Sequence, residues 1–234
     1  MVFIFLYSVM NTKKQLIEIC KKQGIKGYSG KNKDQLLQMI QTNISPVNTT
    51  DTYTTDTYTK ELLREQYALH KSYVNGRIET TQKIGVKVRF PSIPEDISEN
   101  IVKQILHKLH DKTSRWDCKQ GDLHSKKEGK QEVKCFTSNG PCSFTPTSNW
   151  DILYFLDARN WLTDKFILYR IPLKRTSTEW KNIKVNKTQT FEDQSKQGRR
   201  PRISWDSLQP QIVNHCNKVY EGNFEDIFIP GVME

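Results

Sequence analysis

The stretch that decides the fold is residues 121–136, GDLHSKKEGKQEVKCF. Because side chains of a strand alternate between its two faces, Glu132 and Lys134 are predicted to project together from one face of a strand. Gly129 and its polar neighbours cannot easily continue a strand, so they predict a turn. A chain that folds back at this turn brings Asp122 beside Glu132. Two carboxylates and one ammonium group would then share one surface.

These three side chains are of the types that metal-dependent phosphoryl chemistry uses. Carboxylate oxygens are hard ligands suited to Mg2+, and a neighbouring lysine can stabilise the charge that develops on a phosphoryl group. Taken alone, a Glu-x-Lys pattern on a strand is most often an ordinary solvated face. The presence of Asp122, ten residues before Glu132 and across the turn, favours a catalytic interpretation.

The flanking sequence predicts the rest of an α/β domain. Apolar residues recur at helical spacing over residues 61–75 and 96–110, and they alternate as in a strand over residues 84–90. Central strands that lie close together in sequence, with helical segments on either side, indicate a mixed β-sheet flanked by helices in one domain at residues 60–234. Further strands are expected at residues 116–124, 131–136, 150–156 and 165–172.

Residues 11–42 predict a separate, small N-terminal helix–loop–helix module. Thr12 with Gln15 three residues later is a capping-box pattern, and Gly24 is a typical helix end. Seven lysines against two acids give this module a net charge of +5. The apolar positions of its second helix are Leu36, Leu37 and Ile40.

Residues 43–59 predict a flexible tether between the two domains. The segment repeats TDTYT directly, at residues 50–54 and 55–59, and is rich in Thr, Asp and Asn. Such a composition cannot bury enough apolar surface to order itself. Its presence strengthens the two-domain interpretation.

The first ten residues, MVFIFLYSVM, are the one run that could be taken for a targeting or membrane segment. A membrane-spanning helix needs about 20 residues, and a signal peptide carries basic residues before its apolar part. We therefore expect residues 1–10 to be poorly ordered, or else to pack as a short strand or tail, in a soluble protein with no membrane partner. The five cysteines lack the paired spacing of a zinc site, in keeping with an intracellular location.

The charge balance indicates a polyanionic partner. The chain has 36 Lys and Arg against 26 Asp and Glu, a net charge of +10. This balance argues against an acidic small-molecule enzyme and points first to nucleic acid. No GxxxxGK, GxGxxG or GxSxG pattern is present, so ATP-driven and serine-hydrolase functions lack support.

Five stretches between residues 98 and 203 resemble the PD-(D/E)XK nuclease superfamily, and in particular small type II restriction endonucleases. They are SENIVKQIL, GDL, QEVKCFTSNGPCSF, NWDILYFLDA and GRRPRI. The resemblance places the family's two acids on Asp122 and Glu132, its lysine on Lys134 and an accessory helix acid on Glu99, which can equally be a solvent-facing residue. Gly121 stands where the name-giving proline would be. That proline mainly shapes the backbone, so no ligand is lost.

This resemblance implies a sequence-specific endonuclease that hydrolyses double-stranded DNA to 5′-phosphate and 3′-hydroxyl ends. Asp122, Glu132 and the main-chain carbonyl of Val133 would hold Mg2+ as the cofactor, and Lys134 would orient the attacking water or help to deprotonate it. Enzymes of this class commonly act as homodimers, each active site cutting one strand of a palindrome. The alternatives are a structure-specific repair or recombination nuclease and a non-catalytic DNA-binding protein with a degenerate nuclease fold.

Two further segments favour contact with DNA, and a solvated loop is the alternative for each. The loop at residues 137–144 follows the catalytic strand directly and offers hydrogen-bonding side chains to phosphates or base edges. Residues 196–202, KQGRRPR, place four cations in seven residues, for which phosphate contact is expected. The candidate residues are Ser138, Asn139, Ser143, Arg199, Arg200 and Arg202.

Residues 12–40, TKKQLIEICKKQGIKGYSGKNKDQLLQMI, resemble the SAP motif, a small helix–loop–helix DNA-binding module. The resemblance implies DNA contact by Lys31 in the turn and by Lys33, where the amides of a helix start favour a phosphate. An amphipathic helical hairpin with solvated lysines is the alternative. The positions that carry the resemblance are Leu16, Ile25, Ser29, Gly30, Lys31, Leu36 and Ile40.

Overall fold

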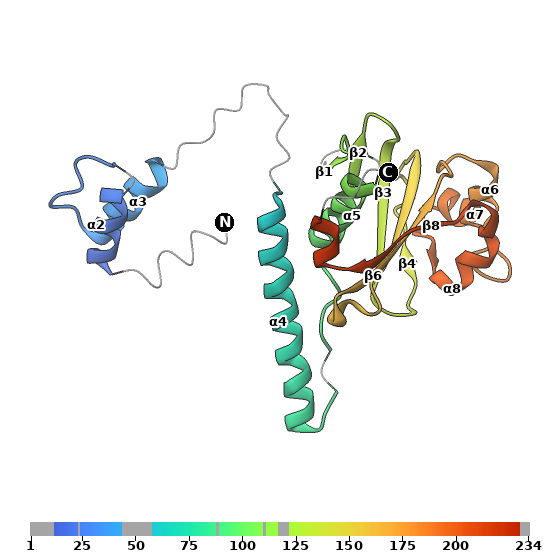
Figure 1. Ribbon diagram of the computed structural model, residues 1–234, viewed down its shortest axis with the longest axis horizontal. Coiled ribbons are helices and arrows are strands. Elements are labelled where there is room, and N and C mark those ends of the chain that lie inside the picture. The colour runs from blue at the N-terminus through green and yellow to red at the C-terminus, as the bar shows by residue number, and fades with distance from the viewer. Residues whose placement is uncertain are drawn as a thin grey trace. The chain divides into compact units, whose positions relative to one another are not determined.

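The computed structural model of the chain describes residues 12–22, 24–43, 58–87, 89–109, 111–116 and 122–229. The chain divides into two compact units, Met1–Thr55 and Asp56–Glu234, and each is considered by itself (Figure 1). Residues 1–10, nearly all of the expected tether and Gly121 lie outside the described residues. The expectations about them therefore stay predictions.

The first unit is a pair of helices, α2 (Lys13–Lys22) and α3 (Lys33–Asn43). The predicted capping box is present, because the Gln15 N–H donates to Thr12 Oγ1 at 3.4 Å and the Thr12 N–H donates to Gln15 Oε1 at 2.7 Å. Gly24 follows α2 with a φ of +67°, a conformation that glycine adopts without strain. The small core of this unit consists of Leu16, Cys20, Ile25, Leu36 and Ile40.

The second unit is built around a six-stranded mixed sheet with the strand order β1-β2-β3-β5-β6-β8, in which β3 and β5 form the one parallel pair. A separate two-stranded sheet joins β4 to β7. The predicted mixed sheet flanked by helices is confirmed. The strands are β1 (Arg115–Trp116), β2 (Leu123–Ser125), β3 (Gly129–Phe136), β4 (Cys142–Ser143), β5 (Ile152–Asp157), β6 (Lys165–Ile171), β7 (Arg202–Ile203) and β8 (Asn217–Asn223).

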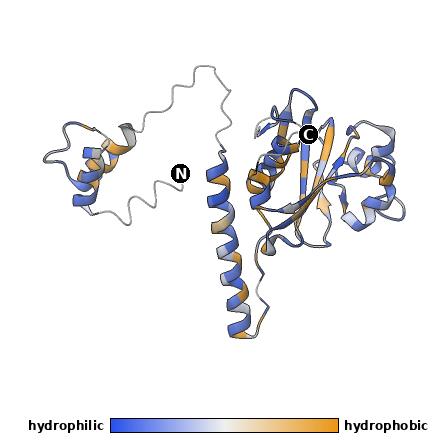
Figure 2. Cartoon of the chain, viewed as in Figure 1, coloured by the Kyte–Doolittle hydropathy of each residue, from blue (hydrophilic) through white to orange (hydrophobic). Residues whose placement is uncertain are grey.

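Helices cover both faces of the large sheet (Figure 1). Along β5, alternate side chains enter two different cores: Tyr154 packs with α4 and α5, and Phe155 packs with α7 and α8. Because both faces of β5 are covered, all of its residues are buried, and it is free of charged residues up to its last one, Asp157. Figure 2 shows the hydrophobic colour in the central part of this sheet. The helices are α4 (Lys60–Ile84), α5 (Glu95–Leu109), η1 (Trp161–Thr163), α6 (Thr178–Lys181), α7 (Phe191–Lys196), α8 (Trp205–Leu208), η2 (Gln209–Gln211), η3 (Val213–His215) and η4 (Glu225–Phe228).

The strand predicted at residues 84–90 is wrong. The helix expected at residues 61–75 is longer than predicted: α4 continues to Ile84. Gly85 ends it with a φ of +67°. The described residues after Gly85 are irregular up to the start of α5. Alternating polarity makes a strand only where a neighbouring strand can supply hydrogen bonds, and the described residues of this segment pair with no strand of either sheet. Among the described residues, no helix is long and apolar enough to span a bilayer.

A buried charge holds the turn between β2 and β3. Glu128 accepts hydrogen bonds from the Tyr154 hydroxyl, from Gln131 Nε2 at 2.9 Å and from Arg170 Nε at 3.0 Å. Burial alone would raise the pKa of Glu128, but these hydrogen bonds outweigh it and lower the pKa. The next residue, Gly129, has a φ of +70°, and a Cβ there would lie 2.4 Å from a carboxylate oxygen of Asp151, so the turn requires glycine.

We expect Glu128→Gln to lower the free energy of unfolding by about 2 kcal/mol at neutral pH, because it leaves the partly buried Arg170 without its carboxylate. The folded pKa of Glu128 is lowered, so the stability that it gives is present above the unfolded pKa and lost as the pH falls through the folded pKa. Urea titrations at neutral and acidic pH should therefore show a smaller acid loss in the variant. An equal stability change in Glu179→Gln, at an exposed position, would contradict this role.

Candidate active site

Glu132 and Lys134 lie on one face of β3 and form an ion pair. Lys134 Nζ is 2.6 Å from Glu132 Oε1, and the two side chains are 20% and 9% exposed. The ammonium group also lies over the ring of Phe144, 5.5 Å from its centroid. Since little water reaches this pair, the two charges are held in a defined geometry.

Asp122 lies just before β2, at the edge of β3. The antiparallel pairing of β2 with β3 ends at Leu123 opposite Gln131, so Asp122 comes next to Glu132. Its Oδ2 accepts the Val133 main-chain N–H at 2.7 Å. The N–H and C=O of one strand residue point to the same edge of the strand. The Val133 carbonyl is therefore turned toward the edge at which Asp122 lies.

Burial and neighbouring charges shift the pKa values of these groups. Burial, together with the charge of Glu132, raises the pKa of Asp122 to about 6. Burial would lower the pKa of Lys134, but the carboxylates of Glu132 and Asp122 outweigh it and raise that pKa. Lys134 therefore stays protonated at neutral pH, and the surroundings of Asp122 favour an additional positive charge.

Glu99 reaches the same place from α5. Its Oε2 accepts the indole N–H of Trp116 at 2.6 Å. Burial raises the pKa of Glu99 to about 8, and the charge of Asp122 adds to that shift. These surroundings differ from those of a solvent-facing helix acid, the alternative considered above. The structure thus brings together all four residues that were predicted to be catalytic.

A fourth acidic residue near the site, Glu95, was not predicted. Its charge contributes to the raised pKa values of both Glu99 and Asp122. Glu95 lies one helical turn before Glu99 on α5, and side chains at this spacing share a helix face. That spacing is the signal in the sequence that could have identified it. The hydrogen bond between Trp116 and Glu99 was also not predicted, although Trp116 was expected to lie in a strand.

The oxygen atoms at this edge of β3 can be compared with the ligands that Mg2+ requires. Among the described residues, no three side chains of His, Cys, Asp or Glu are grouped so as to hold a metal ion by themselves. The set implied for Mg2+ needs two carboxylates, Asp122 and Glu132, because its third ligand is the main-chain oxygen of Val133. All three donors are hard oxygens. Burial and the charge of Glu132 raise the pKa of Asp122, and a cation bound between these carboxylates would offset both effects. The chemistry of this donor set fits Mg2+.

The two segments expected to contact DNA are joined through their backbones. Ser143 of β4 pairs with Arg202 of β7, and the Phe144 N–H donates to the Pro201 carbonyl at 3.0 Å. The side chains of Ser143 and Arg202 are exposed. Because Lys134 lies over the Phe144 ring, this small sheet is next to the face of β3 that carries Glu132 and Lys134. Arg199 and Arg200 are exposed in the turn that leads into β7.

Ser138 and Asn139 are exposed in the loop after β3, where each makes a local contact. Ser138 Oγ accepts the Gly140 N–H at 3.3 Å, and Asn139 Oδ1 accepts a hydrogen bond from Arg159 at 3.1 Å. Arg159 also pairs with the buried Asp157 at 2.6 Å and so ties this loop to the end of β5. Arg159 was not predicted, because its partners are distant in sequence. Lys31 and Lys33 belong to the first unit, at the start of α3.

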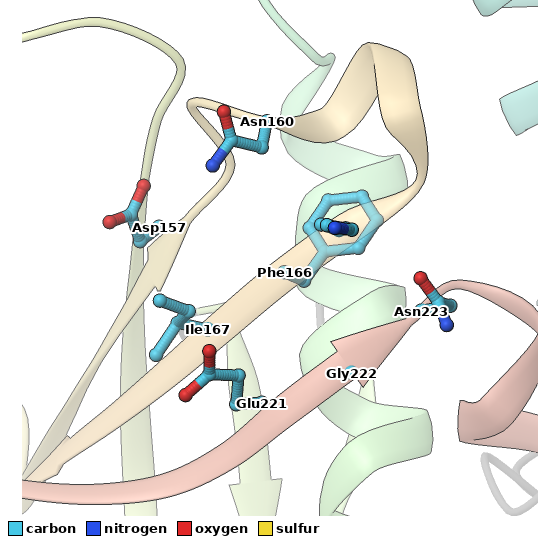
Figure 3. Close-up of a pocket in the computed structure, with 8 residues that line it drawn as sticks. Asp157, Asn160, Phe166, Ile167, Glu221, Gly222 and Asn223 are labelled. Carbon is cyan, nitrogen blue, oxygen red and sulfur yellow. The ribbon is translucent and has the colours of Figure 1, made fainter.

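A hollow of about 250 Å³ lies at the ends of β5, β6 and β8. In Figure 3 the polar groups of Asp157, Asn160 and Glu221 border it. The residues that line it include none of the four predicted catalytic residues. We therefore place the candidate active site at the edge of β3, where these four residues lie.

Comparison with known proteins identifies one family. The model of a family described as the Bsp6I restriction endonuclease matches residues 57–215. Over 62 residues the chain is 48% identical to the type II restriction enzyme Bsp6I of Bacillus sp. (strain RFL6). That alignment covers 26% of this chain and 34% of the curated relative, so it spans about a third of the relative's length. No solved structure matches the chain.

Proposed function

The chain belongs to the Bsp6I restriction endonuclease family, and on this premise we propose that it is a type II restriction endonuclease. In this proposal it cuts double-stranded DNA at a specific sequence, requires Mg2+ and leaves 5′-phosphate and 3′-hydroxyl ends. The observation that carries the proposal is the grouping of Glu99, Asp122, Glu132 and Lys134 at one edge of β3. All four lie within the residues that the family model matches.

Each residue has a proposed task at the scissile phosphate. Asp122, Glu132 and the Val133 carbonyl would hold Mg2+, which when bound lowers the pKa of water and neutralises phosphate charge. Lys134 is held as an ammonium group, so it acts by orienting the attacking water and stabilising negative charge. Proton abstraction by Lys134, the other role considered, does not suit a lysine with a raised pKa. Glu99 would complete the acidic shell from α5.

The proposed DNA surface is the exposed side of the β4–β7 sheet together with the loops that lead into it. Its support is that Ser143 and Arg202, from distant segments, pair directly beside the strand of Lys134. Arg199 and Arg200 add two exposed cations at the same end of β7. A duplex whose phosphate lies at Lys134 would thus meet these cations along its backbone.

We expect Arg202→Ala to weaken DNA binding about 10-fold and to reduce the slope of log K against log salt by about 1. The side chain is exposed at the end of a two-residue strand, so its loss should not disturb the fold. Fluorescence anisotropy with a labelled duplex over a range of salt concentrations measures both quantities. Lys60→Ala, which removes an exposed cation at the start of α4, is the matched control. The same slope in both variants would contradict a contact by Arg202.

The first unit is proposed to add DNA affinity of the SAP type. Its α3 begins at Lys33, with Lys31 in the turn just before it, so cations surround a helix start that favours phosphate. A module joined to the nuclease by a tether raises the local concentration of DNA without adding contacts at the catalytic strand. A homodimer is also proposed, because cutting both strands of a palindrome takes two copies of this active site.

Digestion of a sequenced plasmid in the presence of Mg2+ tests the proposed activity. Discrete fragments with ends that map to one short sequence, carrying 5′-phosphates, are expected. A smear, or cleavage confined to branched or damaged DNA, would favour the structure-specific nuclease instead. Binding in gel shifts without any cleavage in Mg2+ or Mn2+ would overturn the enzymatic proposal and leave the non-catalytic alternative.

A further inference from the structure

The helix α4 carries two apolar stripes, and one of them faces solvent. Leu63, Tyr67 and Val74 are buried in the core of the second unit. Leu69 and Tyr73 lie on another side of the helix and are 59% and 55% exposed. The exposed stripe continues along this side at spacings of three or four residues, which keep its members on one helix face. We call Leu69, Tyr73, Gly76, Thr80 and Ile84 the outer face of α4.

This exposure is concentrated in one part of the unit. Eight large hydrophobic residues are exposed among the described residues, and five of them lie between residues 69 and 90. Single exposed apolar residues are normal, whereas their concentration in one segment favours an interaction site. Figure 1 shows α4 at the margin of the second unit, with its C-terminal turns extending beyond the sheet, and Figure 2 shows hydrophobic residues along it.

Gly76 lies in the middle of the outer face. Glycine is among the least favourable residues in a helix interior. A Cβ added to Gly76 would meet nothing within 4 Å, so packing inside the chain does not explain the glycine. Thr80, one turn later, donates its hydroxyl to the Gly76 carbonyl at 2.8 Å and needs no other partner for that group. Because Gly76 has no side chain and the Thr80 hydroxyl is already hydrogen-bonded, another helix can approach α4 closely at this point.

We propose that the outer face of α4 is the interface between two copies of this chain, packed antiparallel about a two-fold axis. With the axis midway between residues 74 and 75, positions whose numbers add up to 149 face each other. Tyr73 of each copy then lies over Gly76 of the other, and Leu69 lies against Thr80. The Tyr73–Gly76 contact therefore occurs twice, once on each side of the two-fold axis. This is the self-complementarity that an isologous interface requires.

The charges beside the outer face favour the same direction of packing. Glu65 and Lys83 are both exposed, and Lys83 has one long ion pair within its own helix, at 4.0 Å from Glu79. In the antiparallel arrangement Glu65 of one copy approaches Lys83 of the other. In a parallel arrangement each would face its own like charge, and Tyr73 would meet Tyr73. This inference depends on the surface of α4 and not on the proposed nuclease activity.

Sedimentation equilibrium of the full chain tests the interface without any cleavage assay. The wild type is expected to have the mass of a dimer at micromolar concentrations, and Tyr73→Glu should weaken the association by at least about 100-fold, since it buries a charge at the centre of the interface. Val213→Glu changes a similarly exposed apolar residue outside α4, at the start of η3, and should remain dimeric. A monomeric wild type, including one whose residues 1–11 cover α4, would overturn the proposal. A dimeric Tyr73→Glu would do the same.

A second variant guards against loss of folding. Leucine is a better helix former than glycine, so Gly76→Leu should fold at least as well as the wild type. It should nevertheless be monomeric, because the leucine side chain occupies the space that Tyr73 of the second copy would fill. Cysteine cross-linking then tests the direction. A mixture of Leu69→Cys and Thr80→Cys chains should form disulfide-linked dimers that neither variant forms alone. Efficient cross-linking of Leu69→Cys alone would contradict the antiparallel arrangement.

Discussion

Replacing Lys134 with alanine is expected to lower the rate of Mg2+-dependent plasmid cleavage by about 100- to 1,000-fold, the cost of losing one charge that stabilises a developing anion. Lys134 pairs with Glu132, the acidic residue of β3, at 2.6 Å. The proposed DNA surface on the β4–β7 sheet is untouched by this change, so the affinity for the duplex should stay within about threefold of the wild type, as expected for the loss of one cation among many.

The matched control for this prediction is Lys130→Ala, which removes a lysine from the same strand four residues before Lys134. Cleavage is measured under single-turnover conditions and binding by gel shift in the presence of Ca2+. Lys134→Arg is a useful third variant, because it keeps the charge but changes the donor geometry. Full cleavage activity in Lys134→Ala, with the control unchanged, would remove Lys134 from the mechanism and with it the main support for the assignment of this edge as the active site.

Asp122→Asn is expected to have opposite effects on activity and stability. Cleavage should fall by at least about 1,000-fold, because an amide is a poor substitute for a carboxylate ligand of Mg2+. In metal-free buffer at neutral pH the variant should be more stable than the wild type by on the order of 1 kcal/mol, since the folded protein no longer holds an ionised carboxylate whose pKa is raised to about 6. The amide oxygen can still accept the Val133 N–H.

The pH dependence carries the sign of this effect. A carboxyl with a raised folded pKa binds its proton more tightly in the folded state, so its contribution is fully present below the unfolded pKa and is lost as the pH rises through the folded pKa. Wild-type stability in EDTA should therefore decline between about pH 4 and pH 6 relative to Asp122→Asn. Urea titrations measure this difference, with Asp206→Asn as a control at an exposed carboxylate. Added Mg2+ should stabilise the wild type and leave Asp122→Asn unchanged. A destabilised Asp122→Asn would indicate a structural carboxylate.

Much of this site could be predicted because its chemistry is local in sequence. The turn before Gly129 and the alternation of Glu132 with Lys134 lie within one hairpin, and a hairpin forms from neighbouring residues. The helix with Glu99 could be predicted from its apolar period, although the spacing alone did not show its burial. What the pattern does not contain is the tertiary environment that raises the pKa values of Glu99 and Asp122.

The remaining features depend on contacts between distant residues. The pairing of β4 with β7 joins residues about sixty positions apart, and no local signal in a two-residue strand announces it. Arg159 reaches Asn139 across the end of β5 for the same reason. The strand expected at residues 84–90 failed for the same reason, because its alternating pattern is local and no partner strand pairs with the described residues there. The SAP-type function, the tether and the Mg2+ site stay predictions.

The one parallel pair of strands in the sheet has an architectural consequence. Two neighbouring antiparallel strands can be joined by a tight turn, whereas parallel strands need a long crossover. β3 and β5 are parallel, so residues 137–151 must leave the end of the catalytic strand and return to the start of its neighbour. That excursion begins at the very strand that carries Glu132 and Lys134, and it contains β4. The topology thus makes a long connecting segment obligatory beside the candidate site residues, and this segment supplies one strand, β4, of the small β4–β7 sheet that lies next to Lys134.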